Sequence, residues 1–204
     1  SLYVSRFHHD IKPRGYVRWI LTDENTGKKV SSGCSNLIVN WSRQKLAEAI
    51  IGTVPTWPGF VAVGTGTSDP AAADPTLQTI FQYDGANDAK AVDSKAILSL
   101  YTARFVAQFT TAQANTTIRE IGLYDAANSG NLWARVSVNI TKTATQRLTV
   151  YWYITFDRGV DVAIKSGASI GATGTITAAT NSVLTFATPC TIVMIHNNAG
   201  EKIY

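Results

Sequence analysis

The sequence predicts a mainly β protein, namely an antiparallel β-sandwich or barrel-like domain with one short α-helix, followed by a small all-β segment. The first observation is composition, because charged residues are only 16% of the chain and Thr, Ser, Asn, Ala and Gly are abundant, as in proteins of many short strands and turns. The second is the alternation of apolar and polar residues along several segments, which is the period of a strand. The third is that one segment alone combines helix formers with cap residues at both ends.

The chain has 204 residues, which is enough for one substantial β domain and a small appendix. We place the main domain at residues 14–158 and an N-terminal arm at 1–13. Residues 159–204 hold few charges and much Gly, Ala and Thr. A segment of about forty-five residues is marginal for an independent core. We therefore expect it to pack on the main domain or on another chain.

The first two strands are predicted on either side of a tight turn. Alternation over residues 14–21 puts Val17, Trp19 and Leu21 on one side, as expected of a half-buried strand. A turn follows at residues 25–27, where Gly tolerates positive φ. The sequence "VSSGCSNLIV" then returns as the partner strand.

The helix is predicted directly after this strand pair. Asn40 can act as N-cap, "WSRQKLAEAII" contains good helix formers, and Gly52 can provide a left-handed C-cap. Leu46, Ala49 and Ile50 would form its buried stripe. Two prolines in "TVPTWPG" then end the helix, and "FVAVG" predicts a short buried strand.

Two glycines after that strand raise the question of a phosphate-binding loop. Such a loop requires Lys and Ser or Thr at the start of a helix, but Gly64 and Gly66 are followed by Asp69 and Pro70. An acidic residue and a proline there would repel the phosphate and disrupt the helix. We therefore predict that the glycines let the chain turn sharply out of the buried strand.

Three longer strands are predicted after a mostly irregular excursion between Pro70 and Lys95. They cover residues 101–109, 132–140 and 147–156, and the short link "TKTATQ" makes the last two an antiparallel hairpin. Alternation assigns the following residues to their buried faces: Tyr101, Ala103, Phe105, Ala107 and Phe109; Leu132, Ala134, Val136, Val138 and Ile140; Leu148, Val150, Trp152, Ile154 and Phe156.

Several aromatic residues lie outside these buried faces and are interface candidates. Trp133, Tyr151 and Tyr153 share the opposite side of the predicted hairpin, and Trp57 lies in the "PTWPG" loop. Exposed aromatics can stack on sugars or form the buried centre of a protein interface. We favour protein contact, because the C-terminal segment must pack somewhere.

The two ends of the chain are further interface candidates. Phe7 lies in the N-terminal arm, and Ile203 and Tyr204 give the chain an apolar, strand-like ending. A terminal strand of this kind can pair with an exposed sheet edge of a neighbour.

Arg119 and Glu120 interrupt an otherwise apolar run. A bulge, or an ion pair between Glu120 and a residue such as Arg104 on a neighbouring strand, would compensate the charges. The alternative is a glycosidase in which Glu120 is the general acid and Asp125 its partner carboxylate. Nothing else in the sequence supports that chemistry, so we assign Glu120 a structural role.

No metal, cofactor or nucleic-acid site is predicted. His8, His9 and Asp10 could ligate a metal, but adjacent histidines on a strand point in opposite directions. Cys34 and Cys190 lack the spacing of a zinc or redox site. The net charge of +4 comes from residues scattered along the chain, without the dense basic run that grips nucleic acid.

The chain contains no apolar stretch long enough to cross a membrane and no signal-peptide pattern at its start. We therefore expect a soluble chain without membrane insertion.

Three segments together resemble a family of bacteriophage virion structural proteins, described as tail-fibre, baseplate or other particle components. They are "NLIVNWSRQKLAEAIIG" at 36–52, "VAVGTGTSDPAAADPTLQ" at 61–78, and "FTTAQANTTIREIGLYD" at 109–125, followed by "NLWARVSVN". The resemblance covers roughly residues 14–158. It implies a β-rich structural module without catalysis or cofactor, assembled into the virion in the host cytoplasm.

The first hypothesis is therefore a structural protein whose partners are other virion proteins and further copies of the chain in a homo-oligomer. Tail placement, in a fibre, baseplate or adaptor, is ahead of capsid decoration. A receptor-binding module that holds a host-surface glycan is the second hypothesis, and a glycan hydrolase is the third.

Overall fold

The computed structural model describes residues 12–99 and 101–157, together with four short strands nearer the C-terminus. The chain divides into two compact units, of which Pro13–Asp157 is one. This main unit is mainly β, with antiparallel pairing at every register the structure gives and a single α-helix in the described residues. The predicted fold class is confirmed.

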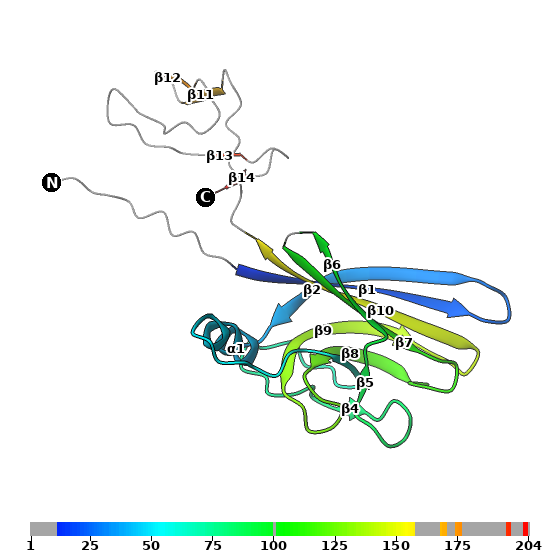
Figure 1. Cartoon of the computed structure of the whole chain (residues 1–204). Helices are drawn as coiled ribbons and strands as arrows, with labels where there is room; N and C mark the ends of the chain where they lie inside the picture. The colour runs from blue at the N-terminus through cyan, green and yellow to red at the C-terminus, as the bar shows by residue number, and fades with distance from the viewer. Residues whose placement is uncertain are drawn as a thin grey trace. The chain divides into compact units, whose positions relative to one another are not determined.

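Nine strands form one continuous path of pairings, in the order β4-β3-β8-β9-β2-β1-β10-β7-β6, and β5, the tenth strand of the sheet, pairs with β3 off this path. Figure 1 shows strands of the main unit in two layers, one with β1, β10, β7 and β6 and the other with β8 and β9. β3 pairs with β8. The strands are β1 (Lys12–Asp23), β2 (Lys29–Ile38), β3 (Phe60–Gly64), β4 (Ile80–Phe81), β5 (Ala89–Ala91), β6 (Ser94–Ser99), β7 (Thr102–Phe109), β8 (Thr117–Tyr124), β9 (Leu132–Thr141) and β10 (Gln146–Asp157).

The two layers are joined through β2. Residues 29–36 of β2 pair with β1, while Leu37 and Ile38 at its end pair with Arg135 and Ala134 of β9. The turn between β1 and β2 has Gly27 at φ 69°, as predicted. One strand therefore passes from the first layer to the second, and this closes one side of the sandwich.

The core lies between the layers, and it matches the alternation predicted for β1, β7 and β10. Apolar side chains from both layers form one buried cluster, which includes Val17, Leu21, Val61, Val63, Phe105, Ala107, Phe109, Ile121, Leu123, Val136, Leu148, Val150, Trp152 and Ile154. Tyr101, predicted at the start of the β7 inner face, is instead 37% exposed, because β7 begins only at Thr102.

The predicted hairpin of β9 and β10 is wrong. β9 pairs with β8 and β2, whereas β10 pairs with β7 and lies next to β1. The link between them therefore crosses from one layer to the other. A link of this length fits either arrangement, and the choice depends on which strands already border each layer.

The predicted outward face of β9 is also wrong in its first half. Every residue from Leu132 to Val136 is buried, including Trp133 at 3% exposure and Arg135 at 2%. Trp133 belongs to the core cluster, because the register of β8 against β9 shifts between Leu123 and Tyr124. Arg135 lies on the side away from the core and is covered by the loop after β3. Alternation marks one face as apolar, but it does not show that other elements also cover the opposite face.

The helix α1 spans Asn40–Ile50, so Asn40 is its first residue rather than its N-cap. The N-cap is Val39, whose carbonyl accepts a hydrogen bond from Ser42 Oγ at 2.7 Å. Gly52 follows the helix at φ 91°, as predicted. Leu46 packs on the core, but Ile50 is 86% exposed, so the predicted buried stripe does not reach the helix end.

The excursion between Pro70 and Lys95 is mostly irregular, as predicted, with only β4 and β5 as short additions to β3. Its "YDGAND" turn has Gly85 at φ 83°. Asp84 accepts hydrogen bonds from the backbone N–H groups of Ala86 and Asn87 and from the Asn87 side chain. These bonds, led by that of the Asn87 side chain, lower the pKa of Asp84 to about 2.

The short strands after residue 157 form two antiparallel ladders. β11 (Ala168–Ile170) pairs with β12 (Gly174–Ile176), and β13 (Ile195–His196) pairs with β14 (Lys202–Ile203). Ile203 lies opposite Ile195 in the second ladder. Other residues of the sequence predictions lie outside the described residues, namely Phe7, His8, His9, Asp10, Cys190 and Tyr204.

Candidate functional site

The charged pair that interrupts the apolar run of β8 is accommodated by a bulge. The register of β8 against β9 shifts between Ile118 and Glu120, so that Arg119 is exposed and Glu120 is fully buried. An ion pair is present as well, because Arg135 Nη2 lies 2.9 Å from Glu120 Oε2. The predicted partner Arg104 is wrong, since Arg104 lies on β7, opposite Tyr153 of β10.

Backbone N–H groups of the loop after β3 converge on the Glu120 carboxylate. Gly66 N and Thr79 N donate to Oε1 at 3.0 and 2.8 Å, and Gln78 N donates to Oε2 at 3.0 Å. We call these three N–H groups the Glu120 cradle. The loop therefore does gather donors around an anion, as a phosphate loop would, but the anion is a side chain of the same chain.

Arg135 extends this network into the loop. Its guanidinium contacts Asp74 through Nη1, and its Nη2 donates to the carbonyl and the hydroxyl of Ser68, both at 2.9 Å. The side chain of Gln78 accepts hydrogen bonds from Thr67 N and Ser68 N at 2.7 Å. Buried charges of opposite sign thus hold residues 65–79 against β8 and β9.

Gly64 and Gly66 serve close packing rather than the sharp turn that we predicted. Neither of them has positive φ, whereas Gly27, Gly52 and Gly85 do. A Cβ atom on Gly64 would lie 2.6 Å from both Glu120 Oε1 and the Thr79 carbonyl oxygen, and one on Gly66 would lie 2.5 Å from Glu120 Oε1. The glycines are therefore needed because the carboxylate occupies the space of a side chain.

Glu120 and Asp125, the two carboxylates of the glycosidase hypothesis, are both buried and accept hydrogen bonds from other residues of the chain. Glu120 is fully enclosed by the cradle and Arg135. Asp125 is buried and accepts hydrogen bonds from the backbone and side-chain nitrogens of Asn131 at 2.6 and 2.9 Å. A general acid must reach the substrate oxygen, and the enclosure of Glu120 argues against that role.

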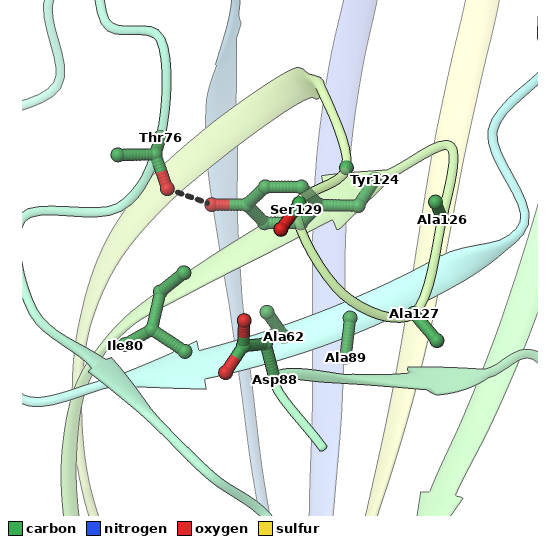
Figure 2. Close-up of a pocket in the computed structure, with 10 residues that line it drawn as sticks. Ala62, Thr76, Ile80, Asp88, Ala89, Tyr124, Ala126, Ala127 and Ser129 are labelled. Atoms are coloured by element: carbon green, nitrogen blue, oxygen red, sulfur yellow. Dashed lines mark hydrogen bonds between the residues drawn. The ribbon is translucent and has the colours of Figure 1, made fainter.

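A small cavity lies beside Tyr124, at the end of β8. Figure 2 shows the Tyr124 ring directed toward Thr76, whose hydroxyl lies 2.9 Å from the phenol oxygen. Leu77 N also donates to this oxygen at 2.8 Å, and burial raises the pKa of Tyr124. The cavity has a volume of about 50 Å³, which suits water rather than a substrate.

A much larger hollow, of about 370 Å³, lies where β6, β7 and β10 approach α1 and the loop that contains Trp57. We call it the tryptophan groove. Trp57 is 49% exposed, and its ring lies 5.9 Å from that of the buried Trp133. The groove is lined by Leu46, Trp57, Pro58, Lys95, Ala96, Ile97, Ala103, Arg104, Phe105, Trp133, Ile154 and Phe156.

The lining of the groove is apolar except for Lys95 and Arg104. Lys95 Nζ donates to the Pro58 carbonyl at 3.0 Å and lies 5.9 Å from the Phe105 ring centre. The Arg104 Nε atom is buried without a hydrogen-bond partner among the described residues. The groove thus offers a large apolar surface with positive charge beside it and no lining carboxylate.

The interface candidates do not form one patch. Trp57 and Trp133 belong to the tryptophan groove, whereas Tyr151 and Tyr153 are half-buried on the face of β10 that points away from Trp152. Tyr153 lies 6.3 Å from Tyr16 of β1, measured between ring centres. The prediction that Trp133 shares a surface with these tyrosines is wrong, because β9 lies in the other layer.

Other sites considered from the sequence find no counterpart in the described residues. No group of three or more His, Cys, Asp and Glu side chains there could hold a metal. Cys34 is a half-buried free thiol, and burial raises its pKa. In the part of the chain that the structure describes, no helix is long and apolar enough to cross a membrane.

Comparison of the chain with protein-family models, with curated proteins and with solved structures finds no match. The candidate site is therefore argued from its own geometry. Sequence reasoning identified Trp57 but missed the groove, because its lining comes from segments far apart in the chain. Sequence reasoning also missed Arg135 as the partner of Glu120, and the available signal was its position as a cation in an apolar strand.

Proposed function

We propose that this chain is a non-enzymatic structural component of a bacteriophage virion, tail-associated in a fibre, baseplate or adaptor. It acts through self-assembly and through contacts with other virion proteins, which it binds at the tryptophan groove. The groove is the observation that carries the proposal. An apolar hollow with a half-exposed tryptophan is the usual anchor point of a protein interface, where Trp, Tyr and Arg contribute most of the binding energy.

The sequence resemblance supports the virion assignment. Its three segments supply α1, the loop that carries the Glu120 cradle, and strands β8 and β9. The network of Glu120 and Arg135 holds the loop and the two strands together. The resembling residues are thus the framework of the main unit, and Trp133 in the same framework forms the inner wall of the groove.

A protein side chain suits the groove better than a sugar does. Carbohydrate recognition needs several polar groups beside the aromatic ring to bind hydroxyls. The polar side chains of the groove lining are Lys95 and Arg104, and Lys95 already donates to a backbone carbonyl. An apolar side chain of another virion protein would bury the exposed part of Trp57 against the apolar lining.

Two alternatives remain open to test. A capsid decoration protein would use the same groove at a different place in the particle. A receptor-binding module for a host-surface glycan is favoured by another observation, the tyrosines Tyr16, Tyr151 and Tyr153 on the outer face of β1 and β10. Aromatic rings on an exposed sheet can stack on sugars.

The test is to locate the chain on purified phage particles by immunoelectron microscopy and to quantify it by immunoblot. We expect labelling of the tail, and an about tenfold or greater loss of incorporation for Trp57→Ala, since anchor residues cost at least about 2 kcal/mol on truncation. Ile50→Ala is the control, because Ile50 is 86% exposed and does not line the groove.

Each outcome separates the hypotheses. Absence of the chain from purified particles would refute the virion assignment, and labelling of the capsid would select the decoration alternative. Normal incorporation of Trp57→Ala would refute the role of the groove. Binding to a glycan array that is lost in Tyr153→Ala would favour the receptor-binding module.

A further inference from the structure

The strand β6 is an exposed end of the sheet. It is the last strand in the order of pairings, and among the described residues it pairs with β7 alone. Two of its side chains are unusually exposed for apolar residues, Ile97 at 74% and Leu98 at 48%. An edge strand presents a row of unpaired N–H and C=O groups, and apolar residues on it favour pairing with another strand.

The edge has little protection against such pairing. Native edge strands are commonly blunted by charges, prolines or very short length. β6 has six residues with one charge, Lys95, and no proline. Its one irregularity is a register shift against β7 between Ile97 and Ser99.

The free sheet edges of a second copy of the main unit are the candidate partners of β6. At the opposite end of the sheet, β4 has only two residues, and β5 beside it has three. Neither can provide a ladder as long as β6. Residues 29–36 of β2 pair with β1 alone among the described residues and are long enough, but Val30 is their one exposed large apolar side chain. The apolar match for β6 is therefore β6 of a second copy.

We propose that two copies of this chain associate by antiparallel pairing of their β6 strands about a two-fold axis, with Ile97 of one copy opposite Ile97 of the other. The inference deepens the proposed function and rests on its self-assembly, for which it names the contact. A two-fold contact uses the same patch on both copies and closes at two, so it covers both edges without forming a fibre.

The register follows from the side chains of β6. A continuous sheet that keeps both cores on the same side requires residues on the same face to lie opposite each other. Centring the pairing on Ile97 places it opposite itself and places Ala96 opposite Leu98, so that apolar residues meet on both faces. Lys95 then lies opposite Ser99, and the lysines of the two copies stay apart.

The alternative register with the same face relation is less favourable. Centring the pairing on Ala96 puts Lys95 opposite Ile97 and Ser94 opposite Leu98. Each exposed apolar side chain would then face a polar one. Cross-strand pairs of apolar residues stabilise a sheet more than these mixed pairs do, which selects the register centred on Ile97.

The experiment measures the mass of the full chain by light scattering and sedimentation equilibrium over a concentration series. We expect a dimer for the wild type and at least about tenfold weaker dimerisation for Ile97→Lys and for Ile97→Glu, because each places like charges opposite each other. Ile50→Lys is the matched control, since Ile50 is also an exposed apolar residue. Circular dichroism and thermal denaturation verify that each variant is folded.

Mixing the two variants tests the register itself. If residue 97 faces residue 97, an equimolar mixture of Ile97→Lys and Ile97→Glu chains should restore the dimer, now as a heterodimer. A wild-type monomer at every concentration overturns the inference, as does equal weakening by Ile50→Lys or a mixture that stays monomeric. A β6 dimer that is absent from phage particles would refute the virion assignment and leave the pairing standing.

Discussion

Replacing Glu120 with Gln should strongly destabilise the main unit while keeping the shape of the side chain. The carboxylate is fully buried and accepts three backbone N–H groups and the Arg135 guanidinium. Each oxygen accepts two of these donors. An amide has one oxygen and one NH₂ group, so in either orientation its NH₂ would face two donors that need an acceptor.

The magnitude follows from the lost charge and the unsatisfied donors. Removing one partner of a buried ion pair costs about 3–5 kcal/mol, and each buried donor without an acceptor costs about 1–3 kcal/mol. Asp74 still contacts Arg135 and limits the loss. We therefore expect Glu120→Gln to lower the free energy of unfolding by about 3–5 kcal/mol, which is a large part of the 5–15 kcal/mol typical of a native protein.

Urea denaturation followed by tryptophan fluorescence measures this loss. All five tryptophans lie between Trp19 and Trp152, so the signal reports the main unit. Arg119→Gln is the matched control, because Arg119 is the exposed neighbour of Glu120 and surface substitutions usually change stability by less than about 0.5 kcal/mol.

A loss below about 1 kcal/mol for Glu120→Gln would refute the reasoning. It would mean that Asp74 and water satisfy Arg135 and the cradle without the second carboxylate. An equal loss for Arg119→Gln would show that the bulge, rather than the buried charge, is the sensitive feature.

Three further predictions concern single groups of the main unit. Burial lowers the pKa of Lys142 from 10.5 to about 8. Between these pH values the unfolded chain binds more protons than the folded one, so the free energy of unfolding rises with pH by on the order of 2–3 kcal/mol. Lys142→Met should abolish this rise when unfolding is compared at pH 7 and pH 10, and an equal rise in the variant and the wild type would contradict the prediction. Gly66→Ala should cost about 1–3 kcal/mol in urea denaturation, because its Cβ would lie 2.5 Å from Glu120 Oε1; a cost typical of a surface position would mean that the loop yields. The carboxyl of Asp84 should titrate near pH 2 by NMR, and the pKa of this carboxyl should rise in Asn87→Ala. An unchanged pKa in the variant would rule out Asn87 as the main cause. The contribution of Asp84 to stability is present above the ordinary pKa of 3.8 and is lost as pH falls toward 2.

Much of the local structure could be predicted because its causes are local. The two-residue period of β1, β7 and β10 marks the faces that are buried. Gly27 and Gly52 have the positive φ that turns and helix ends require. The need for a bulge or an ion pair at Glu120 could also be predicted, since a charge in an apolar strand must be compensated wherever the strand lies.

Long-range pairing decided the rest. The partner of Glu120 is Arg135 rather than Arg104, because β8 is bordered by β9 and β3 while β7 lies in the other layer. For the same reason β9 and β10 do not form a hairpin, although their link is short enough for one. A short link limits the distance between strand ends, but it does not determine which strand each one pairs with.

The sequence by itself determined the β class, the helix α1 and the buried faces of β1, β7 and β10. Only the tertiary structure decided that Trp133 is buried beside Trp57 in a groove, that the loop glycines enclose a carboxylate, and that β6 is left at the edge. The physical reason is the distance along the chain over which each effect acts. Propensity and periodicity act over a few neighbouring residues, whereas layer, register and cavity depend on segments that meet only when the whole sandwich has formed.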